Sequence, residues 1–199
     1  DVHEEMSLEP LTDYSKFKAE GEEILKTFES DNFTTVTLRP ATVCGYSKRQ
    51  RLDVVVNILT NLAYHTKEIS VFGGSQLRPN IHIDDMVDAY LLMLEAPKSK
   101  IAGQKFNVSS ENHTVIELAE MVKREVGKDV KLVVSETNDL RSYHISSKKI
   151  FKELNFATSR PIRKASADLV KAFSDGLLPN SLEDERYFNI KKMQSVHLE

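Results

Sequence analysis

Two side chains with acid–base chemistry stand four residues apart near the start of the sequence, Tyr14 and Lys18 in the run Tyr-Ser-Lys-Phe-Lys. On a helix, residues at this spacing lie on one face, one turn apart. A phenol has an unperturbed pKa of about 10, and a neighbouring ammonium favours its ionised form. The pair is therefore suited to taking a proton from a hydroxyl group while a hydride leaves the same carbon. On its own, the spacing is equally compatible with a chance surface pair on an amphipathic helix.

The elements around this pair can be predicted from hydrophobic periodicity and capping residues. Thr12 or Asp13 can cap a helix whose core-facing residues recur at helical spacing, and a β-branched run over 33–38, closed by Pro40, predicts a strand. Thr114 with Glu117 predicts a capping box that opens a helix ending near Gly127. Further helices are predicted over 53–64, 84–94, 147–154 and 165–173, and further strands over 69–72, 105–108 and 130–134.

Alternation of helices and strands predicts an α/β fold, and the composition narrows the function classes. The chain has 199 residues, 40% hydrophobic and 29% charged, with a net charge of −3, the profile of a soluble globular protein without a basic nucleic-acid surface. No apolar run approaches the ~20 residues that cross a bilayer. A single cysteine, Cys44, fits a cytoplasmic location, and six scattered histidines predict no metal site.

Five motifs in order carry a resemblance to a known family. They are residues 14–23 (YSKFKAEGEE), 38–45 (LRPATVCG), 73–85 (GGSQLRPNIHIDD), 106–108 with the helix opened by Thr114, and 141–143 with the Lys148 helix. Together they resemble the extended short-chain dehydrogenases/reductases, specifically the NAD-dependent nucleotide-sugar epimerases and dehydratases. The resemblance runs from about Leu8 to Phe173.

This resemblance implies a partial Rossmann-like fold with a small α/β substrate-binding lobe. Residues 1–45 are expected to be a remnant of the dinucleotide-binding domain with the catalytic helix. Residues 46–179 are expected to be mainly substrate-binding lobe with returning Rossmann elements, and residues 180–199 an extended tail. The family's Gly-x-x-Gly-x-x-Gly loop, which binds the dinucleotide pyrophosphate, is not in this sequence. A fragment, a proteolysed chain and one part of a two-chain enzyme each explain this, and a fragment is the simplest.

The resemblance also implies roles for particular residues. Tyr14 is the expected base and Lys18 its activator, and both are expected to contact the cofactor, NAD or NADP, together with Pro40 and Ala41. Four residues are expected to bind a nucleoside-diphosphate sugar, namely Thr42, Asn57, Arg78 and Arg141. Thr42 departs from the family pattern, because many relatives carry Asn at that position.

Each substrate-binding assignment has a structural alternative. Asn57 could cap its helix or face solvent, and Arg141 could pair with Asp139. Arg78 could form a salt bridge with Asp84 or Asp85. The basic run over 48–51 could line a sugar-nucleotide cleft or be a solvated loop. Structural roles are predicted for three further residues: His82 and Asp85 in fixing a turn and capping the next helix, and Cys44 in packing.

The resemblance implies an NAD(P)-dependent epimerase, dehydratase or reductase that works through a transient 4-keto sugar, with epimerase the favoured reading. A 4-ketoreductase, a non-catalytic sugar-nucleotide-binding module, an inactive fragment and a cofactor-sensing relative are the alternatives. The chain alone is expected to be inactive and not to retain the cofactor. Apolar surface should be exposed on the early helix and strand. A homodimer through the Tyr14 helix is a further expectation, because relatives often pair through that helix.

Overall fold

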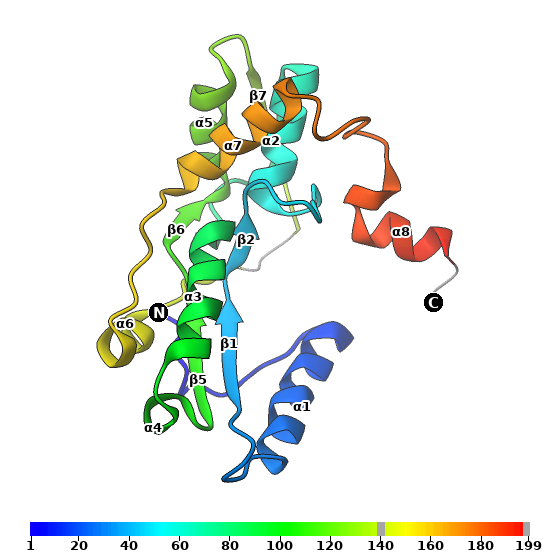
Figure 1. Ribbon diagram of the computed structural model, residues 1–199. Coiled ribbons are helices and arrows are strands. Elements are labelled where there is room, and N and C mark those ends of the chain that lie inside the picture. The colour runs from blue at the N-terminus through cyan, green and yellow to red at the C-terminus, as the bar shows by residue number, and fades with distance from the viewer. Residues whose placement is uncertain (139–141, 197–199) are drawn as a thin grey trace.

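The computed structural model describes residues 1–138 and 142–196, and it shows a mixed α/β fold built on short parallel sheets (Figure 1). Strand β1 (Val36–Pro40) pairs in parallel with β5 (Gln104–Val108), from Val36 opposite Gln104 to Pro40 opposite Val108. Helix α3 (Ile83–Glu95) and the short helices α4 (Lys98–Ile101) and α6 (Lys148–Leu154) lie around this pair. The predicted α/β class is confirmed.

Strand β2 (Thr42–Cys44) continues the line of β1 but changes partner. The Ala41 amide still donates to the Val108 carbonyl at 2.8 Å. From Thr42 onward the chain pairs in parallel with β4 (Leu77–His82), which pairs on its other edge, antiparallel, with β6 (Glu111–Thr114). The residues between β1 and β2 therefore lie where the chain passes from one sheet to the next.

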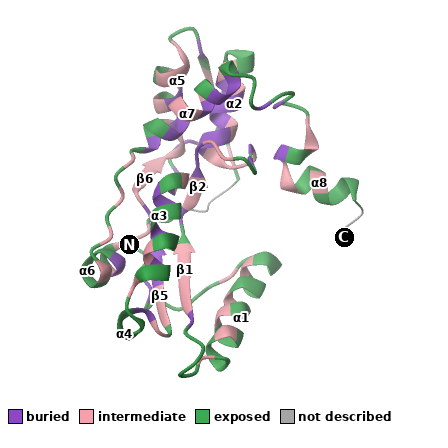
Figure 2. Ribbon diagram, in the orientation of Figure 1, coloured by how far each residue is buried: buried purple, intermediate pink, exposed green. Residues whose placement is uncertain are grey.

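A second group of elements forms a lobe at the other end of the molecule. Strands β3 (Glu68–Phe72) and β7 (Lys131–Ser135) pair in parallel. Helices α2 (Val55–Thr66) and α5 (Val115–Val126) pack on this sheet, and α7 (Ile162–Ser174) packs on both helices. The facing sides of the three helices are buried (Figure 2). The predicted capping box of Thr114 and Glu117 is confirmed at the start of α5.

Helix α1 (Asp13–Thr27) is placed differently. Thr12 caps it as predicted, and its amide and hydroxyl share a capping box with Ser15. All of α1 lies within the described chain, and none of its residues is buried (Figure 2). The expectation of exposed apolar surface on this helix is confirmed, because four of its large apolar side chains are more than half exposed: Tyr14, Phe17 and Ile24, with Phe28 at its C-cap.

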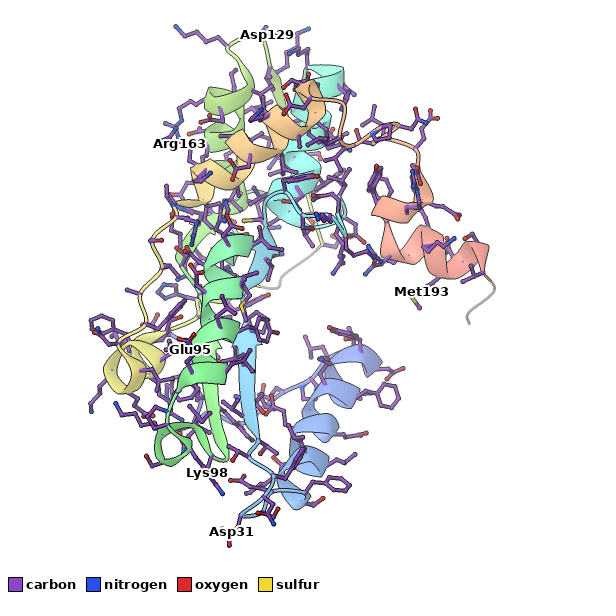
Figure 3. All side chains as sticks on the ribbon, viewed as in Figure 1. Asp31, Glu95, Lys98, Asp129, Arg163 and Met193 are labelled. Atoms are coloured by element: carbon purple, nitrogen blue, oxygen red, sulfur yellow. The ribbon has the colours of Figure 1, made fainter. Side chains whose placement is uncertain are left out.

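The turn after α1 corrects one strand boundary. The strand was predicted from Phe33, but Phe33 closes a tight turn with Ser30, in which each amide donates to the other residue's carbonyl at 3.0 and 3.2 Å. The strand therefore begins only at Val36. Asp31 at the tip of this turn and Lys98 lie at the same end of the molecule (Figure 3), and Lys98 Nζ donates to the Asp31 carbonyl at 2.7 Å.

The prediction of an extended tail from residue 180 is wrong. The C-terminal segment contains a 3₁₀ turn, η1 (Glu185–Tyr187), and helix α8 (Asn189–Ser195). Ser181 and Tyr187 are buried. The polar composition concealed three apolar anchors, since Leu178, Tyr187 and Phe188 pack with Leu52 and α7. Strands β2, β4 and β6 were not predicted, because β2 has only three residues, Pro79 interrupts the strand pattern of β4, and β6 (ENHT) lacks apolar alternation.

Candidate active site

The candidate site lies where β1 and β5 end and the chain crosses to β4. In open α/β sheets, ligands bind outside the carboxyl ends of strands, at the point where the strand order changes. Pro40, Ala41 and Thr42 occupy this crossing. Ala41 is buried and held by Val108, whereas Pro40 is exposed and Thr42 half-buried. The segment is therefore fixed through its backbone while part of its surface faces outward.

A cavity of about 370 Å³ opens at this crossing, and five of the residues predicted from the sequence line it. They come from three elements that are distant in the chain: Tyr14 from α1, the 40–42 crossing, and Asn57 from α2. The five are Tyr14, Pro40, Ala41, Thr42 and Asn57. The fold thus gathers predicted base, cofactor-binding and substrate-binding residues into one place.

Tyr14 belongs to two adjoining spaces. It lines the cavity at the crossing and also a larger cleft, about 900 Å³, that runs between α1 and β1. Lys18, one turn further along α1, lines this cleft, as do Leu38 and Pro40. The Tyr14 side chain is 75% exposed. The phenol and the ammonium therefore border the same open space, in which a ligand could contact both.

Gly45 lets the backbone turn at the start of the loop after β2, beside the cavity. Its φ is +112°, in the region that side chains rarely adopt, and a Cβ there would meet Ile83 Cγ2 at 3.2 Å. The Gly45 amide donates to Asn57 Oδ1 at 3.0 Å, and Asn57 Nδ2 donates to the Arg51 carbonyl at 2.8 Å. Asn57 neither caps α2 nor faces solvent, because Val54 is the N-cap and Asn57 is 3% exposed. Its amide ties the two ends of the loop together at the cavity wall.

Nine of the residues that line this cavity were not among the predicted site residues, and three of the nine come from the basic run: Arg49, Gln50 and Arg51. Gln50 is buried, its Oε1 accepts from the Ser47 amide at 2.9 Å, and its Nε2 donates to the Arg51 carbonyl at 2.8 Å. The basic run over 48–51 was the available signal. Its composition alone suited a solvated loop equally well.

His82 caps α3 as predicted, whereas Asp85 does not cap this helix but binds the segment at Ser159 and Arg160. His82 caps α3, where its Nδ1 accepts from the Asp84 amide at 3.1 Å, and its Nε2 lies 3.2 Å from Asp168 Oδ2. Asp85 is 1% exposed and accepts from Arg160 Nη1 at 2.6 Å and from the Arg160 amide at 3.0 Å. The hydrogen bonds that Arg160 donates to Asp88 and Asp85 raise the pKa of its guanidinium. These contacts join α3 to the segment that leads into α7.

Cys44 packs in the lobe core, as predicted. It is 1% exposed, and burial raises the pKa of its thiol to about 12. Its Sγ donates to the Ile81 carbonyl at 3.4 Å. The thiol is therefore held in its neutral form at the edge of the site.

Of the two predicted diphosphate-binding arginines, Arg78 does not line this cavity. It lies on β4 opposite His113, and its Nη1 donates to the Leu77 carbonyl at 3.0 Å. Its two predicted rival partners, Asp84 and Asp85, each form an ion pair with Arg160. Arg141 and its predicted partner Asp139 lie outside the described residues.

Two further findings concern the described residues only. Over 1–138 and 142–196, no group of three or more His, Cys, Asp or Glu side chains is placed to hold a metal ion. In the same ranges, no helix has the length and apolar character needed to cross a membrane.

Comparison with known proteins gives consistent matches. Residues 1–109 match the model of the NAD dependent epimerase/dehydratase family. A putative UDP-arabinose 4-epimerase 2 from Arabidopsis thaliana is 26% identical over 178 residues, covering 78% of this chain and 42% of that protein. The chain therefore spans less than half the length of this relative.

Solved structures show the same fold. The structure of RMD from Pseudomonas aeruginosa, complexed with NADPH, has a TM-score of 0.78 at 17% identity and covers 88% of this chain and 60% of that one. A UDP-glucuronic acid 4-epimerase from Bacillus cereus, in complex with UDP-glucuronic acid and NAD, has a TM-score of 0.74 at 24% identity. It covers 86% of this chain and 56% of that one.

Proposed function

Because the chain belongs to the NAD-dependent epimerase/dehydratase family, within the extended short-chain dehydrogenases/reductases, we propose that the full-length protein is a nucleoside-diphosphate-sugar 4-epimerase. One observation carries the proposal: a single cavity is lined by Tyr14, the 40–42 crossing and Asn57. The 4-epimerase relative from Arabidopsis thaliana supports epimerisation over dehydration or ketone reduction.

In this proposal Tyr14 is the base that removes the proton from the C4 hydroxyl of the sugar. Tyr14 is accessible and lines both the cavity and the cleft. Lys18, one turn away along the cleft, supplies the positive charge that stabilises the phenolate. Loss of the proton from the C4 hydroxyl and of the hydride from C4 leaves a 4-keto sugar. The keto sugar then turns in the site, and return of the hydride to its opposite face, with the proton returned to the oxygen, gives the epimer.

The residues present suit the nicotinamide end of a dinucleotide. Tyr14 and Lys18 line the open cleft, Pro40 lines both the cleft and the cavity, and Ala41 lines the cavity. Lys18 would hold the nicotinamide ribose by hydrogen bonds from its ammonium. NAD or NADP, if bound there, would supply the acceptor and donor for the C4 hydride. The glycine-rich loop for the pyrophosphate is not among these 199 residues, so we expect turnover from the full-length protein and not from the chain alone.

The substrate end of the proposal rests on the cavity wall. The Thr42 hydroxyl can donate one hydrogen bond to the sugar or a phosphate oxygen. The Asn57 amide is engaged with the loop, so its contribution would be mainly to the shape of the wall. Arg78 and Arg141 remain proposed ligands of the diphosphate.

The test is the Tyr14→Phe variant of the full-length protein, assayed with NAD and UDP-arabinose for formation of the C4 epimer by anion-exchange chromatography. Loss of the base should lower kcat by roughly 10²- to 10⁴-fold. Tyr64→Phe is the matched control, because it removes a phenol from the lobe, away from the cavity. Full activity in Tyr14→Phe would show that another group takes the proton. A deoxy or reduced product would replace epimerase by dehydratase or reductase.

A further inference from the structure

A second hollow, which we call the C-terminal cleft, lies between the loop after β2 and the C-terminal segment. Its volume is about 520 Å³. Residues 46–50 form one side of it, and residues 177–179 with parts of η1 and α8 form the other. Tyr14, the 40–42 crossing and Asn57 line the candidate active site but not this cleft. The proposed acid–base chemistry therefore gives the C-terminal cleft no role.

The C-terminal cleft is positively charged, because cations from both of its sides face it and none of the described residues that line it carries a carboxylate. The four cations are Lys48, Arg49, Arg186 and Lys192. Two of them have acidic neighbours behind the lining: Arg186 Nη2 lies 2.6 Å from Asp184 Oδ2, and Lys192 Nζ lies 2.7 Å from Glu185 Oε1. These two carboxylates neutralise only part of the charge of the four cations. The cleft therefore suits an anion.

Much of the remaining lining is aromatic and apolar, formed by Tyr46, Tyr187 and residues 177–179. Tyr187 is buried in one cluster with Leu52 and α7, and Tyr46 packs against that cluster. Burial raises the pKa of Tyr187, which keeps its phenol neutral. The Arg186 Cζ lies 5.9 Å from the centre of the Tyr187 ring. Neutral rings therefore lie next to cations, so one ligand can place a flat ring on the tyrosines and a phosphate on the cations.

The two sides of the C-terminal cleft are joined by hydrogen bonds at its base. The Leu52 amide donates to the Tyr187 carbonyl at 2.8 Å, and Asp53 Oδ2 accepts from the Asn189 amide, at the start of α8, at 2.9 Å. The segment that carries the far side runs from α7 back to the side of the molecule that carries the loop (Figure 1). The cleft is therefore formed before a ligand arrives, which lowers the entropy cost of binding.

We propose that the C-terminal cleft is a second ligand site, separate from the candidate active site, for a phosphate monoester whose organic group contains a flat ring. The cations of the cleft hold the phosphate, because guanidinium forks match its oxygens and ammonium groups add point charges. The ring lies against Tyr46 and Tyr187. Arg49 and Gln50 line both this cleft and the cavity that Tyr14 lines, so an occupant also restrains the loop beside the candidate active site. The proposal does not depend on the proposed function.

The site is tested by calorimetry of the full-length protein with phenyl phosphate as the probe. The double variant Lys48→Gln/Lys192→Gln should weaken binding by roughly ten-fold, because each lost charge counts for a few-fold at a partly exposed side chain. Lys191→Gln is the matched control, since Lys191 lies over the Phe188 ring at 4.3 Å and does not line the cleft. Arg51→Gln is the second control, because Arg51 lines the candidate active site alone. A loss in Arg51→Gln without one in the double variant places the phosphate in the active site and overturns the proposal, as does the absence of binding.

The ring is tested by comparing phenyl phosphate with inorganic phosphate. Phenyl phosphate should bind roughly two- to ten-fold more tightly, since contact between aromatic rings adds to the phosphate contacts. Tyr46→Leu should remove most of this difference and leave the binding of inorganic phosphate unchanged. Equal affinities of the two probes for the unaltered protein overturn the assignment of the flat ring.

The restraint of the loop is tested by limited trypsin digestion with phenyl phosphate present. At a ligand concentration of about ten times Kd, cleavage after Arg51 should slow roughly ten-fold, because the ligand binds the closed loop and not the opened one. Cleavage after Lys128, in the exposed turn before β7, is the internal reference and should not change. The Lys48→Gln/Lys192→Gln variant should lose this protection. Unaltered cleavage after Arg51 overturns the restraint. Binding and proteolysis need no turnover, so their results are independent of Tyr14→Phe, which tests the proposed function.

Discussion

The lobe and helix α1 differ in how far their apolar residues are buried within this chain. Helices α2, α5 and α7 all contribute fully buried apolar residues, including Val56, Leu118 and Leu169, to cores completed within this chain. Helix α1, which carries Tyr14 and Lys18, buries none of its residues. The cavity residue Asn57 therefore lies on a helix that packs into a complete core, whereas Tyr14 and Lys18 lie on a helix whose apolar residues are exposed.

What attaches α1 to the sheet is charge. Arg39 on β1 donates to both oxygens of Glu22, Nε to Oε1 at 2.8 Å and Nη2 to Oε2 at 2.6 Å. Lys105 Nζ on β5 lies 3.3 Å from the same carboxylate. Burial alone would raise the pKa of Glu22, but the hydrogen bonds and charges of Arg39 and Lys105 bring it below its usual value. A bidentate ion pair such as Arg39–Glu22 contributes more to the orientation of a helix than to its stability. The orientation of α1 in turn sets the position of Tyr14.

The largest expected effect is on the free energy of unfolding, which should respond to a change in the lobe but not to one on α1. Leu118→Ala, in the lobe, should lower the free energy of unfolding of the chain by about 2–5 kcal/mol, because it removes buried methyl groups and leaves a cavity. Phe17→Ala, on α1, should change it by no more than about 0.5 kcal/mol, because the ring is 68% exposed. Urea unfolding followed by circular dichroism measures both. Comparable losses from the two variants would show that α1 shares the cooperative core.

The next effect concerns the attachment of α1. Glu22→Gln should weaken it by on the order of 1–3 kcal/mol, since it breaks charge-assisted hydrogen bonds to Arg39. Hydrogen exchange of the α1 amides should accelerate while exchange in α5 stays the same. Glu20→Gln, an exposed acid on the same helix, is the control.

The wild-type attachment of α1 should also depend on pH. A carboxylate with a lowered folded-state pKa stabilises the structure above its unfolded-state pKa, and this contribution is lost as the pH falls through the folded value. The protection factors of the α1 amides, which are corrected for the pH dependence of intrinsic exchange, should therefore fall as the solution is acidified below about pH 4.3, the ordinary pKa of Glu. The Glu22→Gln variant should show a smaller fall over that range. Equal acid dependence in both proteins would place the titrating group elsewhere.

Sequence patterns predicted much of this arrangement, for reasons visible in particular residues. Thr12, Thr114 and Glu117 act through local backbone contacts, which short motifs encode. The positions of Arg49 and Arg51 could not be predicted in the same way. Their place in the cavity depends on Tyr187 and Asn189, about 140 residues away in the chain, and no local pattern encodes that contact.

Strand β6 was not predicted for a related reason. Its sequence, ENHT, has no alternation of apolar and polar residues, and it becomes a strand because β4 lies beside it. Pairing with a partner strand supplied what its own composition lacked. Among the site residues, Tyr14, the 40–42 crossing and Asn57 share one cavity as their motifs suggested, while Arg78 does not line it.

The smallest expected effect on the free energy of unfolding comes from a change on the surface of α1, which should instead reduce self-association of the chain. Replacing Phe17 and Ile24 together by Ser removes the centre of the exposed apolar stripe on α1, where the two side chains are 68% and 59% exposed. Unfolding should be nearly unaffected, but self-association of the chain should decrease, because an uncovered apolar face drives contact between copies. Sedimentation equilibrium over a range of concentrations measures this, with Val133→Ser and Val134→Ser on β7 as the matched pair of exposed apolar residues. If only the β7 pair reduced association, the adhesive surface would belong to the lobe. If neither did, the uncovered stripe on α1 would be tolerated in water, and association through the Tyr14 helix would have no support from this surface.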